Sequence, residues 1–404
     1  MKHEILKMPS QYKSFPKVLL IGGPDVNARI PIIQSLAGQF SISVLGSNPY
    51  LSDAFNQVGI NYSSYNLNRG TNPLADILTM CYLARVISQV HPNIVHTFDT
   101  KPAVLGRLAA WFAHVPVVIG TLPGLGSLYS QNDSRTRAIR SIYQPLQKLA
   151  CSISDLTIFQ NHEDAEQFIR NAVVPRHKTS IINGSGVQIQ IYGPQKFTME
   201  QCHQMRASLG LDETKIVVVM ISRLIRSKGV LEFVQAAKSI REKHPDTVFL
   251  LVGSDDCQSI DVLTHDEREL IAKSVTCLGT RDDVPELLAI SDIFVLPTYY
   301  REGIPRVLLE AASMGLPIVA TNVPGCTEVV EHDANGFLVT PRDVDALRCA
   351  IEALVVDSSL RKRFGAVSRQ RAITRFDLSI IAGQTAEIYK QLLAEKLHGK
   401  QTDS

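Results

Sequence analysis

Two series of short apolar runs rich in Val and Ile, each alternating with amphipathic stretches, constrain the fold of this chain most. The first series comprises residues 17–21, 42–45, 93–96, 115–120, 156–159 and 180–182. The second comprises residues 216–221, 247–252, 275–278, 293–296, 318–320 and 337–339. Apolar strands that alternate with helices predict parallel sheets covered by helices on both faces. We therefore expect an α/β protein with two doubly wound, Rossmann-like domains that bind ligands at the carboxyl ends of their strands.

The length of 404 residues also favours two domains, because it exceeds what one ordinary core supports. A stretch containing Gly, Pro and Gln at residues 184–198 predicts the join. We expect domains at residues 1–190 and 191–376, followed by a helix and tail at residues 377–404.

Cysteine usage and hydropathy indicate the compartment. The seven cysteines show no Cys-x-x-Cys pair and no metal-ligand spacing, which is typical of reduced thiols in a cytoplasmic protein. The N-terminus lacks the apolar run of a signal peptide, and no window approaches 18 uninterrupted apolar residues. We expect a cytoplasmic protein without a spanning helix, with peripheral membrane contact left open.

Charge is distributed unevenly although the net charge is only +2. Residues 1–190 contain 16 Lys and Arg against 10 Asp and Glu, so the remainder is acidic. Residues 133–152 predict a basic amphipathic helix interrupted by Pro145, with the cations Arg135, Arg137, Arg140 and Lys148. This helix is either a packed surface element or a contact for an anionic membrane. Nucleic acid is excluded as a partner, because no aromatic interleaving or binding motif accompanies the charge.

The most informative segment follows the apolar run at residues 293–296. Glu302 falls on a loop at the carboxyl end of this strand, and Pro305 suits the first turn of the next helix. Backbone N–H groups at that helix start favour a phosphate. Glu310, one to two turns along the helix, is placed to accept hydrogen bonds from ribose hydroxyls.

A second segment brackets a helix start with two cations. Arg223 and Lys228 follow the run at residues 216–221 and precede the helix predicted at 230–243. A guanidinium binds phosphate through two hydrogen bonds, and an ammonium supplies a compact charge for a leaving diphosphate. Arg226 between them is interpreted as a solvated charge.

Five motifs in order then resemble the nucleotide-binding half of the family four retaining glycosyltransferases, which have the GT-B fold. They are Arg223-x4-Lys228-Gly229, Val252-Gly253, Leu278-Gly279-x-Arg281-x-Asp283, Glu302-x7-Glu310 and Pro324-Gly325-x2-Glu328. Tyr300-Arg301-Glu302-Gly303-x-Pro305-Arg306-Val307 is similar to bacterial members that build capsule, O-antigen or other undecaprenyl-linked glycans. The resemblance covers about 120 residues and implies two domains facing a cleft, with the last helix crossing back to the first domain.

The resemblance implies a role for each matching residue. Arg223 and Lys228 would bind the donor diphosphate, Glu310 the ribose, and Glu302 with the Gly303–Ile304 backbone the transferred sugar. Leu278, Gly279 and Arg281 would lie at the nucleobase. Gly253 would also bind the donor, and Pro305 would start the helix beside it.

The first half matches the family less closely. Gly22 and Gly23 resemble its flexible first loop, where the backbone approaches the donor. Arg29 and Lys101 are expected on the acceptor side, together with Arg135, Arg137 and Arg140. Many relatives have a histidine where this chain has Pro123, so His96 is the alternative candidate for catalysis.

The predicted activity is retaining transfer of a hexose or N-acetylhexosamine from a UDP-sugar to a polyprenyl-diphosphate-linked acceptor. No metal and no cofactor are expected, and Asp343-x-Asp345 is interpreted as a helix cap rather than a metal motif. The enzyme would work at the inner face of the cell membrane. A nucleotide-sugar 2-epimerase of the same fold and a non-catalytic nucleotide-sugar-binding partner remain alternatives.

Overall fold

The computed structural model describes residues 15–68, 70, 72–124, 134–256 and 261–402. These residues divide into two compact units, one of residues 1–185 with 378–404 and one of residues 186–377. The first break lies a few residues before the expected one. The last helix is part of the first unit, as the family resemblance implied.

The first domain contains a parallel sheet of seven described strands in the order β3-β2-β1-β4-β5-β6-β7. They are β1 Lys17–Ile21, β2 Ser41–Gly46, β3 Asn61–Ser64, β4 Ile94–Thr97, β5 Val117–Leu122, β6 Leu156–Phe159 and β7 Thr179–Ile181. The central strands β4 and β5 are buried throughout, because helices cover both faces of the sheet. Strand β3 was not predicted, since Asn-Tyr-Ser-Ser is a largely exposed edge strand with no apolar run.

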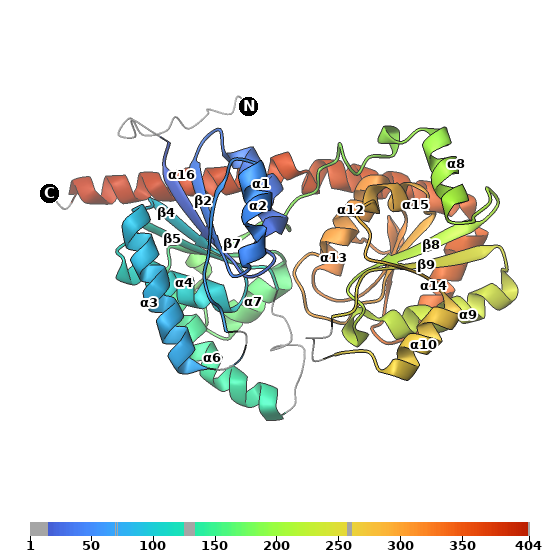
Figure 1. Ribbon diagram of the computed structural model, residues 1–404, viewed down its shortest axis with the longest axis horizontal. Coiled ribbons are helices and arrows are strands. Elements are labelled where there is room, and N and C mark those ends of the chain that lie inside the picture. The colour runs from blue at the N-terminus through green and yellow to red at the C-terminus, as the bar shows by residue number, and fades with distance from the viewer. Residues whose placement is uncertain (1–14, 69, 71, 125–133, 257–260, 403–404) are drawn as a thin grey trace. The chain divides into compact units, whose positions relative to one another are not determined.

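Six helices connect these strands among the described residues. They are α1 Ile30–Leu36, α2 Ser52–Gln57, α3 Pro73–Val90, α4 Lys101–Phe112, α6 Ser134–Ile153 and α7 His162–Arg170. Helix α4 packs against α3 and α6 on one face of the sheet, as Figure 1 shows. On the other face, α1 packs against the last helix, α16 Leu378–Thr402. Tyr389 and Leu393 of α16 are buried in the core of this domain.

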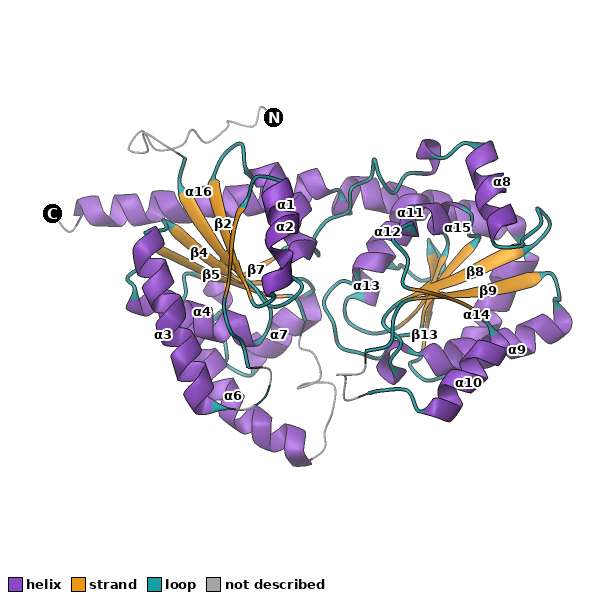
Figure 2. Ribbon diagram, in the orientation of Figure 1, coloured by secondary structure: helices purple, strands orange, loops and turns teal. Residues whose placement is uncertain are grey.

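The second domain contains a parallel sheet of six described strands in the order β10-β9-β8-β11-β12-β13 (Figure 2). They are β8 Ile216–Ile221, β9 Thr247–Val252, β10 Thr276–Gly279, β11 Ile293–Leu296, β12 Ile318–Thr321 and β13 Gly336–Val339. Strands β8, β9 and β11 coincide with the predicted ranges, because each is an unbroken apolar run in the sequence. The two parallel sheets confirm the predicted fold class.

The helices of the second domain form two layers. They are α8 Met199–Ser208, α9 Val230–Lys243, α10 His265–Ser274, α11 Val284–Ala289, α12 Arg306–Met314, α13 Cys326–Val329, α14 Val344–Val356 and α15 Ser358–Arg371. Helix α9 packs against α10 and α14, and α12 packs against α11 and α15. Thr198 and Thr264 start α8 and α10 with capping boxes, which satisfy the free N–H groups of the first turn.

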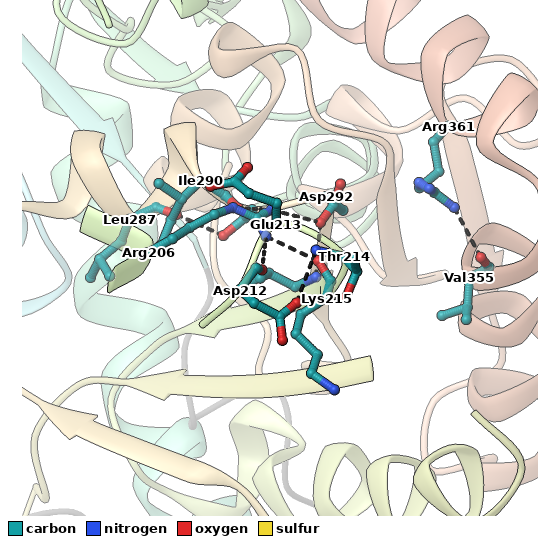
Figure 3. A network of polar contacts seen from close by, with 12 residues as sticks. Arg206, Asp212, Glu213, Thr214, Lys215, Leu287, Ile290, Asp292, Val355 and Arg361 are labelled. Atoms are coloured by element: carbon teal, nitrogen blue, oxygen red, sulfur yellow. Dashed lines mark hydrogen bonds and ion pairs between the residues drawn. The ribbon is translucent and has the colours of Figure 1, made fainter. Parts of the chain in front are cut away.

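A polar network fixes α8 to the amino ends of β8 and β11 (Figure 3). Arg206 of α8 donates to the Ile290 carbonyl at 2.9 Å and pairs with Asp292 at 3.3 Å. The Asp292 carboxylate also accepts the Val217 N–H at 2.8 Å. These contacts secure the sheet edge opposite to the carboxyl ends, where parallel sheets of this type bind ligands.

Among the described residues, no helix is both long enough and apolar enough to cross a membrane.

Candidate active site

Each sheet has one position where the chain order reverses, and several of the predicted residues lie there. In the second domain this switch lies between β8 and β11, and in the first between β1 and β4. The loops leaving such neighbouring strands diverge and leave room for a ligand at the carboxyl edge. Gly22 and Gly23 follow β1, Arg223 and Lys228 follow β8, and Glu302 follows β11. His96 lies within β4, and the predicted nucleobase residues lie at the ends of β9 and β10.

Lys228 and Glu302 meet across the switch of the second domain. The Lys228 ammonium lies 2.5 Å from a Glu302 carboxylate oxygen, and the Lys228 side chain is only 9% exposed. Lys228 closes a short turn that ends at Gly229, which has φ 78° and begins α9. A Cβ at Gly229 would collide with the Pro297 carbonyl, so glycine is needed to bring this turn against the end of β11.

Arg223 lies on the same loop and is paired with Asp256. One guanidinium nitrogen is 2.6 Å from the Asp256 carboxylate, and half of the Arg223 side chain is exposed. The Tyr300 ring lies 6.0 Å from the Arg223 guanidinium and 5.7 Å from the Lys228 ammonium. The structure therefore brings both predicted diphosphate ligands to one aromatic ring.

Arg226 has its own partner. It donates two hydrogen bonds of 2.8 Å to the Glu267 carboxylate at the start of α10. The interpretation of Arg226 as a solvated charge was therefore incomplete, since a bidentate pair holds its side chain away from the two site cations.

The loop after Glu302 is shaped by a close backbone approach. Gly325, with φ 85°, packs against Gly303 so tightly that a Cβ there would collide with the Gly303 carbonyl. Ile304 is buried in the core, and Pro305 precedes the first helical residue of α12, Arg306. Pro305 is thus the N-cap rather than the first residue of the helix, one position from the prediction.

Glu310 lies on the buried side of α12. Its carboxylate accepts a hydrogen bond of 3.0 Å from Arg306 and another from the Tyr192 hydroxyl. Burial raises the pKa of Glu310, and the Arg306 charge opposes this effect. The carboxylate is thus held in one place by one charged and one neutral donor.

The residues predicted at the nucleobase lie at the carboxyl ends of β9 and β10. The Gly253 N–H donates to the Gly279 carbonyl at 2.8 Å, and a Cβ at Gly253 would collide with the Ser222 carbonyl. Arg281 is paired with Asp283 at 2.5 Å. Leu278 packs at the margin of the core. These residues lie along the same carboxyl edge of the sheet as Arg223, because β9 and β10 follow β8 in the strand order.

In the first domain, Gly22 and Gly23 follow β1 and lie beside Asp99, which follows β4. The Gly23 N–H donates to the Asp99 carboxylate at 2.7 Å, and the Tyr65 hydroxyl donates to the Gly22 carbonyl at 2.9 Å. The predicted glycine loop is therefore held by two side chains that the sequence did not single out.

His96 is enclosed within the first domain and only 2% exposed. One ring nitrogen lies 2.6 Å from the Tyr389 hydroxyl of α16, and the other lies 2.7 Å from the Thr121 hydroxyl. Burial lowers the pKa of His96 well below its usual value, and the Arg29 charge adds to this. These contacts favour a neutral ring that joins α16 to β4 and β5, while the predicted catalytic role stays a prediction.

Two of the remaining acceptor-side candidates, Arg29 and Lys101, lie in different environments. Arg29 lies 3.6 Å over the Phe98 ring, and a small cavity of about 30 Å³ is lined by Arg29, His96 and Tyr389 among others. Lys101 pairs with Asp76 at 2.6 Å, at the start of α4. The structure does not gather these residues into one group.

Arg135, Arg137 and Arg140 all belong to α6, which runs unbroken through Pro145. The predicted interruption at this proline is wrong, because the helix continues to Ile153. Proline removes one hydrogen bond, and here the helix tolerates that loss. Arg137 is exposed and Arg140 is partly buried, whereas the Arg135 side chain lies outside the described residues.

The Asp343 carboxylate accepts the Ala346 N–H at 2.9 Å and caps α14, which confirms the cap interpretation. The sequence did not single out Asp256 or Tyr192, and Tyr300 belonged to a recognised motif without a role of its own. Asp256 and Tyr192 pair with Arg223 and Glu310, and Tyr300 lies beside both cations. The acidic pair in the loop after β9 could have indicated Asp256, whereas nothing in the linker sequence indicated Tyr192.

Two family models match the chain. Glycosyl transferases group 1 matches residues 203–371, and Glycosyltransferase Family 4 matches residues 32–184. The first therefore covers the donor-side candidates, and the second covers most of the first domain.

Curated relatives match nearly end to end. The chain is 29% identical over 378 residues to an N,N'-diacetylbacillosaminyl-diphospho-undecaprenol alpha-1,3-N-acetylgalactosaminyltransferase of Campylobacter jejuni, covering 92% of this chain and 97% of that protein. It is 28% identical over 332 residues to a UDP-Gal:alpha-D-GlcNAc-diphosphoundecaprenol alpha-1,3-galactosyltransferase of Escherichia coli, covering 82% and 83%.

Solved structures share the fold. A glycosyltransferase from Rickettsia africae superposes with a TM-score of 0.77 at 22% identity, covering 95% of this chain and 99% of that one. HepE from Anabaena in complex with UDP superposes with a TM-score of 0.76 at 21% identity, covering 93% and 100%.

Proposed function

The chain belongs to the GT-B glycosyltransferases of the capsule and O-antigen type, and we propose that it transfers a hexose or N-acetylhexosamine from a UDP-sugar with retention of anomeric configuration. The acceptor is a hydroxyl of a polyprenyl-diphosphate-linked glycan. The observation that carries this proposal is the Lys228–Glu302 pair at the switch of the donor-side sheet, beside the start of α9.

The two cations of the donor loop stabilise the leaving diphosphate. Arg223 and Lys228 each hold a carboxylate at hydrogen-bonding distance, and a carboxylate resembles a phosphate in charge and oxygen geometry. Donor binding replaces the Asp256 contact of Arg223 with phosphate oxygens. Lys228 then bridges the diphosphate and Glu302, which leaves Glu302 free to accept a sugar hydroxyl.

Glu310 accepts the ribose hydroxyls of the donor. Tyr192 and Arg306 hold its carboxylate in the middle of α12, so little reorganisation is needed when the donor arrives. We assign the N–H groups of Gly303 and Ile304 to the transferred sugar. Gly253, Gly279 and Arg281 form the edge at which the uracil lies.

Retention follows if attack and departure occur on the same face of the sugar. The bond between the anomeric carbon and the diphosphate oxygen breaks, and the acceptor oxygen bonds to that carbon. The acceptor proton passes to the leaving phosphate. Arg223 and Lys228 stabilise the charge that develops on the diphosphate, so the proposed route needs no metal.

The acceptor assignment is supported by the relatives, because the names of two of them specify diphospho-undecaprenol substrates. The cations of α6 add physical support, since an anionic lipid headgroup or diphosphate binds to Arg clusters. We place the enzyme in the cytoplasm at the inner face of the membrane, with α6 on the anionic surface.

The test is a panel of nucleotide sugars, screened first by thermal stabilisation and then by transfer to a short-chain polyprenyl-diphosphate sugar. A cognate UDP-sugar should raise the unfolding temperature and be consumed only when acceptor is present. Epimer formation from donor alone would identify an epimerase instead. If a nucleotide sugar binds but no sugar is transferred to the polyprenyl-diphosphate acceptor, the proposed activity is contradicted.

A further inference from the structure

The first residues of the second domain, 186–193, form an entry segment that packs against α12. The Val187 N–H donates to the Phe376 carbonyl, near the end of the same domain, at 2.8 Å. A turn follows, in which the Tyr192 N–H donates to the Gln188 carbonyl at 3.0 Å. The half-buried Tyr192 side chain then packs against the margin of the core. The entry segment therefore has a defined course as far as Tyr192.

A guanidinium group holds the entry segment to α12. Arg369 of α15 donates to the Tyr192 carbonyl at 3.1 Å and to the Ile189 carbonyl at 3.3 Å. It also donates to the Ser313 carbonyl, in the last turn of α12, at 2.6 Å. The Ser313 hydroxyl in turn donates to the Tyr192 carbonyl at 2.6 Å. The backbone of Tyr192 is thus fixed by two side chains, and neither of them uses the Tyr192 hydroxyl.

A close approach of two helices brings Arg369 to this position. Helices α12 and α15 lie side by side (Figure 1). A Cβ at Gly365 of α15 would collide with the carbonyl of Gly315, the residue that ends α12. Arg369 lies one turn beyond Gly365 and therefore on the same side of α15. Its guanidinium binds neutral carbonyl and hydroxyl oxygens, so Arg369 acts as an anchor for the backbone.

The Tyr192 hydroxyl takes no part in this anchoring and donates to the Glu310 carboxylate. Glu310 lies three residues before Ser313, so both residues share the side of α12 that faces the entry segment. Among the described residues, the carboxylate has this donor and the Arg306 guanidinium, which lies at 3.0 Å. A carboxylate accepts about four hydrogen bonds, so about two remain for a ligand. The 2′- and 3′-hydroxyls of a ribose match this remaining capacity.

A neutral donor suits this position. Only 6% of Glu310 is exposed, and burial raises the pKa of its carboxyl group. The hydrogen bond from Tyr192 opposes that rise in pKa, because it stabilises the ionised form. Unlike a second cation, a phenol leaves the negative charge of the carboxylate available to ribose hydroxyls. Without the phenol hydroxyl, the carboxylate would be oriented by Arg306, whose side chain is 41% exposed.

We propose that Tyr192, fixed by Arg369 and Ser313, is a positioning residue that makes the donor site selective for a nucleoside diphosphate with an intact 2′-hydroxyl group. The inference deepens the proposed function and rests on the role proposed for Glu310 at the donor ribose. Glu310 binds the ribose, and the entry segment holds Glu310 in the orientation that both hydroxyls require. Selectivity for ribonucleotides over 2′-deoxyribonucleotides thus depends on a residue outside α12.

The experiment measures the dissociation constants of UDP and 2′-deoxy-UDP for the full chain by calorimetry. The test variant is Tyr192→Phe, which removes only the hydroxyl group. The control is Tyr299→Phe, because Tyr299 is another half-buried tyrosine of the second domain and its ring lies 4.2 Å from the Arg342 guanidinium. The parent and the control should prefer UDP. The test variant should lose at least about fivefold of this preference, chiefly through weaker binding of UDP.

A second variant separates positioning from packing. Ser313→Ala should lower the preference for UDP in the same direction as Tyr192→Phe. It should add little to the effect of Tyr192→Phe, since both substitutions act on one hydrogen bond to Glu310. If Tyr192→Phe weakens UDP and 2′-deoxy-UDP by the same factor, Tyr192 only supports the packing of the domain and the proposal is overturned. Equal binding of the two nucleotides by the parent would also overturn it.

A transfer assay with the panel of nucleotide sugars separates this inference from the proposed function. If the parent transfers a sugar but Tyr192→Phe keeps the full preference for UDP, the positioning role is wrong and the proposed function stands. If the preference falls as expected but the parent transfers no sugar from any donor, the positioning role stands and the proposed activity is contradicted.

Discussion

The two domains differ in how they hold most of their candidate site residues. In the second domain each singled-out cation is matched to a carboxylate, as in Arg223–Asp256, Lys228–Glu302 and Arg281–Asp283. In the first domain Lys101 also pairs with a carboxylate, that of Asp76, but His96 is held by two hydroxyl groups and Arg29 lies over an aromatic ring. Ion pairs at a partly open edge can exchange one anion for another, whereas a buried neutral network resists exchange.

The switch points of the two similar sheets therefore have different tasks. Lys228 and Glu302 follow β8 and β11, and His96 lies near the carboxyl end of β4, so each set includes residues at a switch point. The second domain has charges ready for a phosphate, and the first uses the same position to anchor α16 through Tyr389. Similar topology therefore does not make the two edges equivalent in chemistry.

The largest expected effect tests the cations of the second domain. Lys228→Ala should lower kcat by about a hundredfold to a thousandfold, because it removes a charged donor to the leaving group. Arg223→Ala should have a smaller effect in the same direction, since this side chain is half exposed. Turnover with the cognate UDP-sugar is the measurement.

Arg226→Ala is the matched control, because Arg226 lies on the same loop but is bound to Glu267. It should keep the parent kcat. If all three variants lose activity equally, the loop is only a structural element, and the assignment of the diphosphate to two specific cations is wrong.

His96→Gln tests the neutral hydrogen-bond network of the first domain. Loss of ideal contacts to Thr121 and Tyr389 should cost about 1–3 kcal/mol in stability of the first domain. The effect on kcat should be only a few-fold. Hydrogen exchange of β4 and α16 measures the stability, and steady-state kinetics measures the turnover. A large fall in kcat with unchanged protection would instead support the predicted catalytic role.

The pH dependence of the stability of the first domain tests the same network. Burial lowers the pKa of His96 in the folded state, so protonation favours the unfolded chain. Stability from this group is complete above the unfolded pKa of about 6.5 and declines as pH falls below it. The parent should therefore lose protection of β4 and α16 on acidification, and His96→Gln should lose less.

A smaller effect is expected from Asp256→Asn. Removing the carboxylate that competes with phosphate for Arg223 should tighten donor binding by up to about fivefold, because exposed ion pairs are worth at most about 1 kcal/mol. Titration with UDP measures the change. Weaker binding would show that Asp256 positions Arg223 for the donor rather than competing with it.

No change is expected on removal of divalent ions. Transfer should continue at the parent rate in excess EDTA, since two cations are proposed to stabilise the leaving group. Loss of activity that magnesium restores would contradict the metal-free route. It would shift attention to acidic residues near the diphosphate, such as Asp256.

Much of the architecture could be predicted from the sequence, because buried parallel strands occur in it as apolar runs. Strands β1, β6, β8, β9 and β11 coincide with their predicted ranges. Strand β3 could not be found in this way, because an exposed edge strand needs no apolar face. The continuity of α6 through Pro145 was also missed, since local propensity does not include the packing that supports the helix.

The sequence alone determined which residues stand at the carboxyl ends of the strands, because motif order and strand order are both linear. It placed Arg223, Lys228 and Glu302 on loops that leave two strands. Only the tertiary structure decided that these strands are neighbours, and hence that Lys228 touches Glu302. It also decided that Tyr389, far along the chain, binds His96. Such partners depend on which elements pack together, and packing is set by the whole core rather than by any local stretch of sequence.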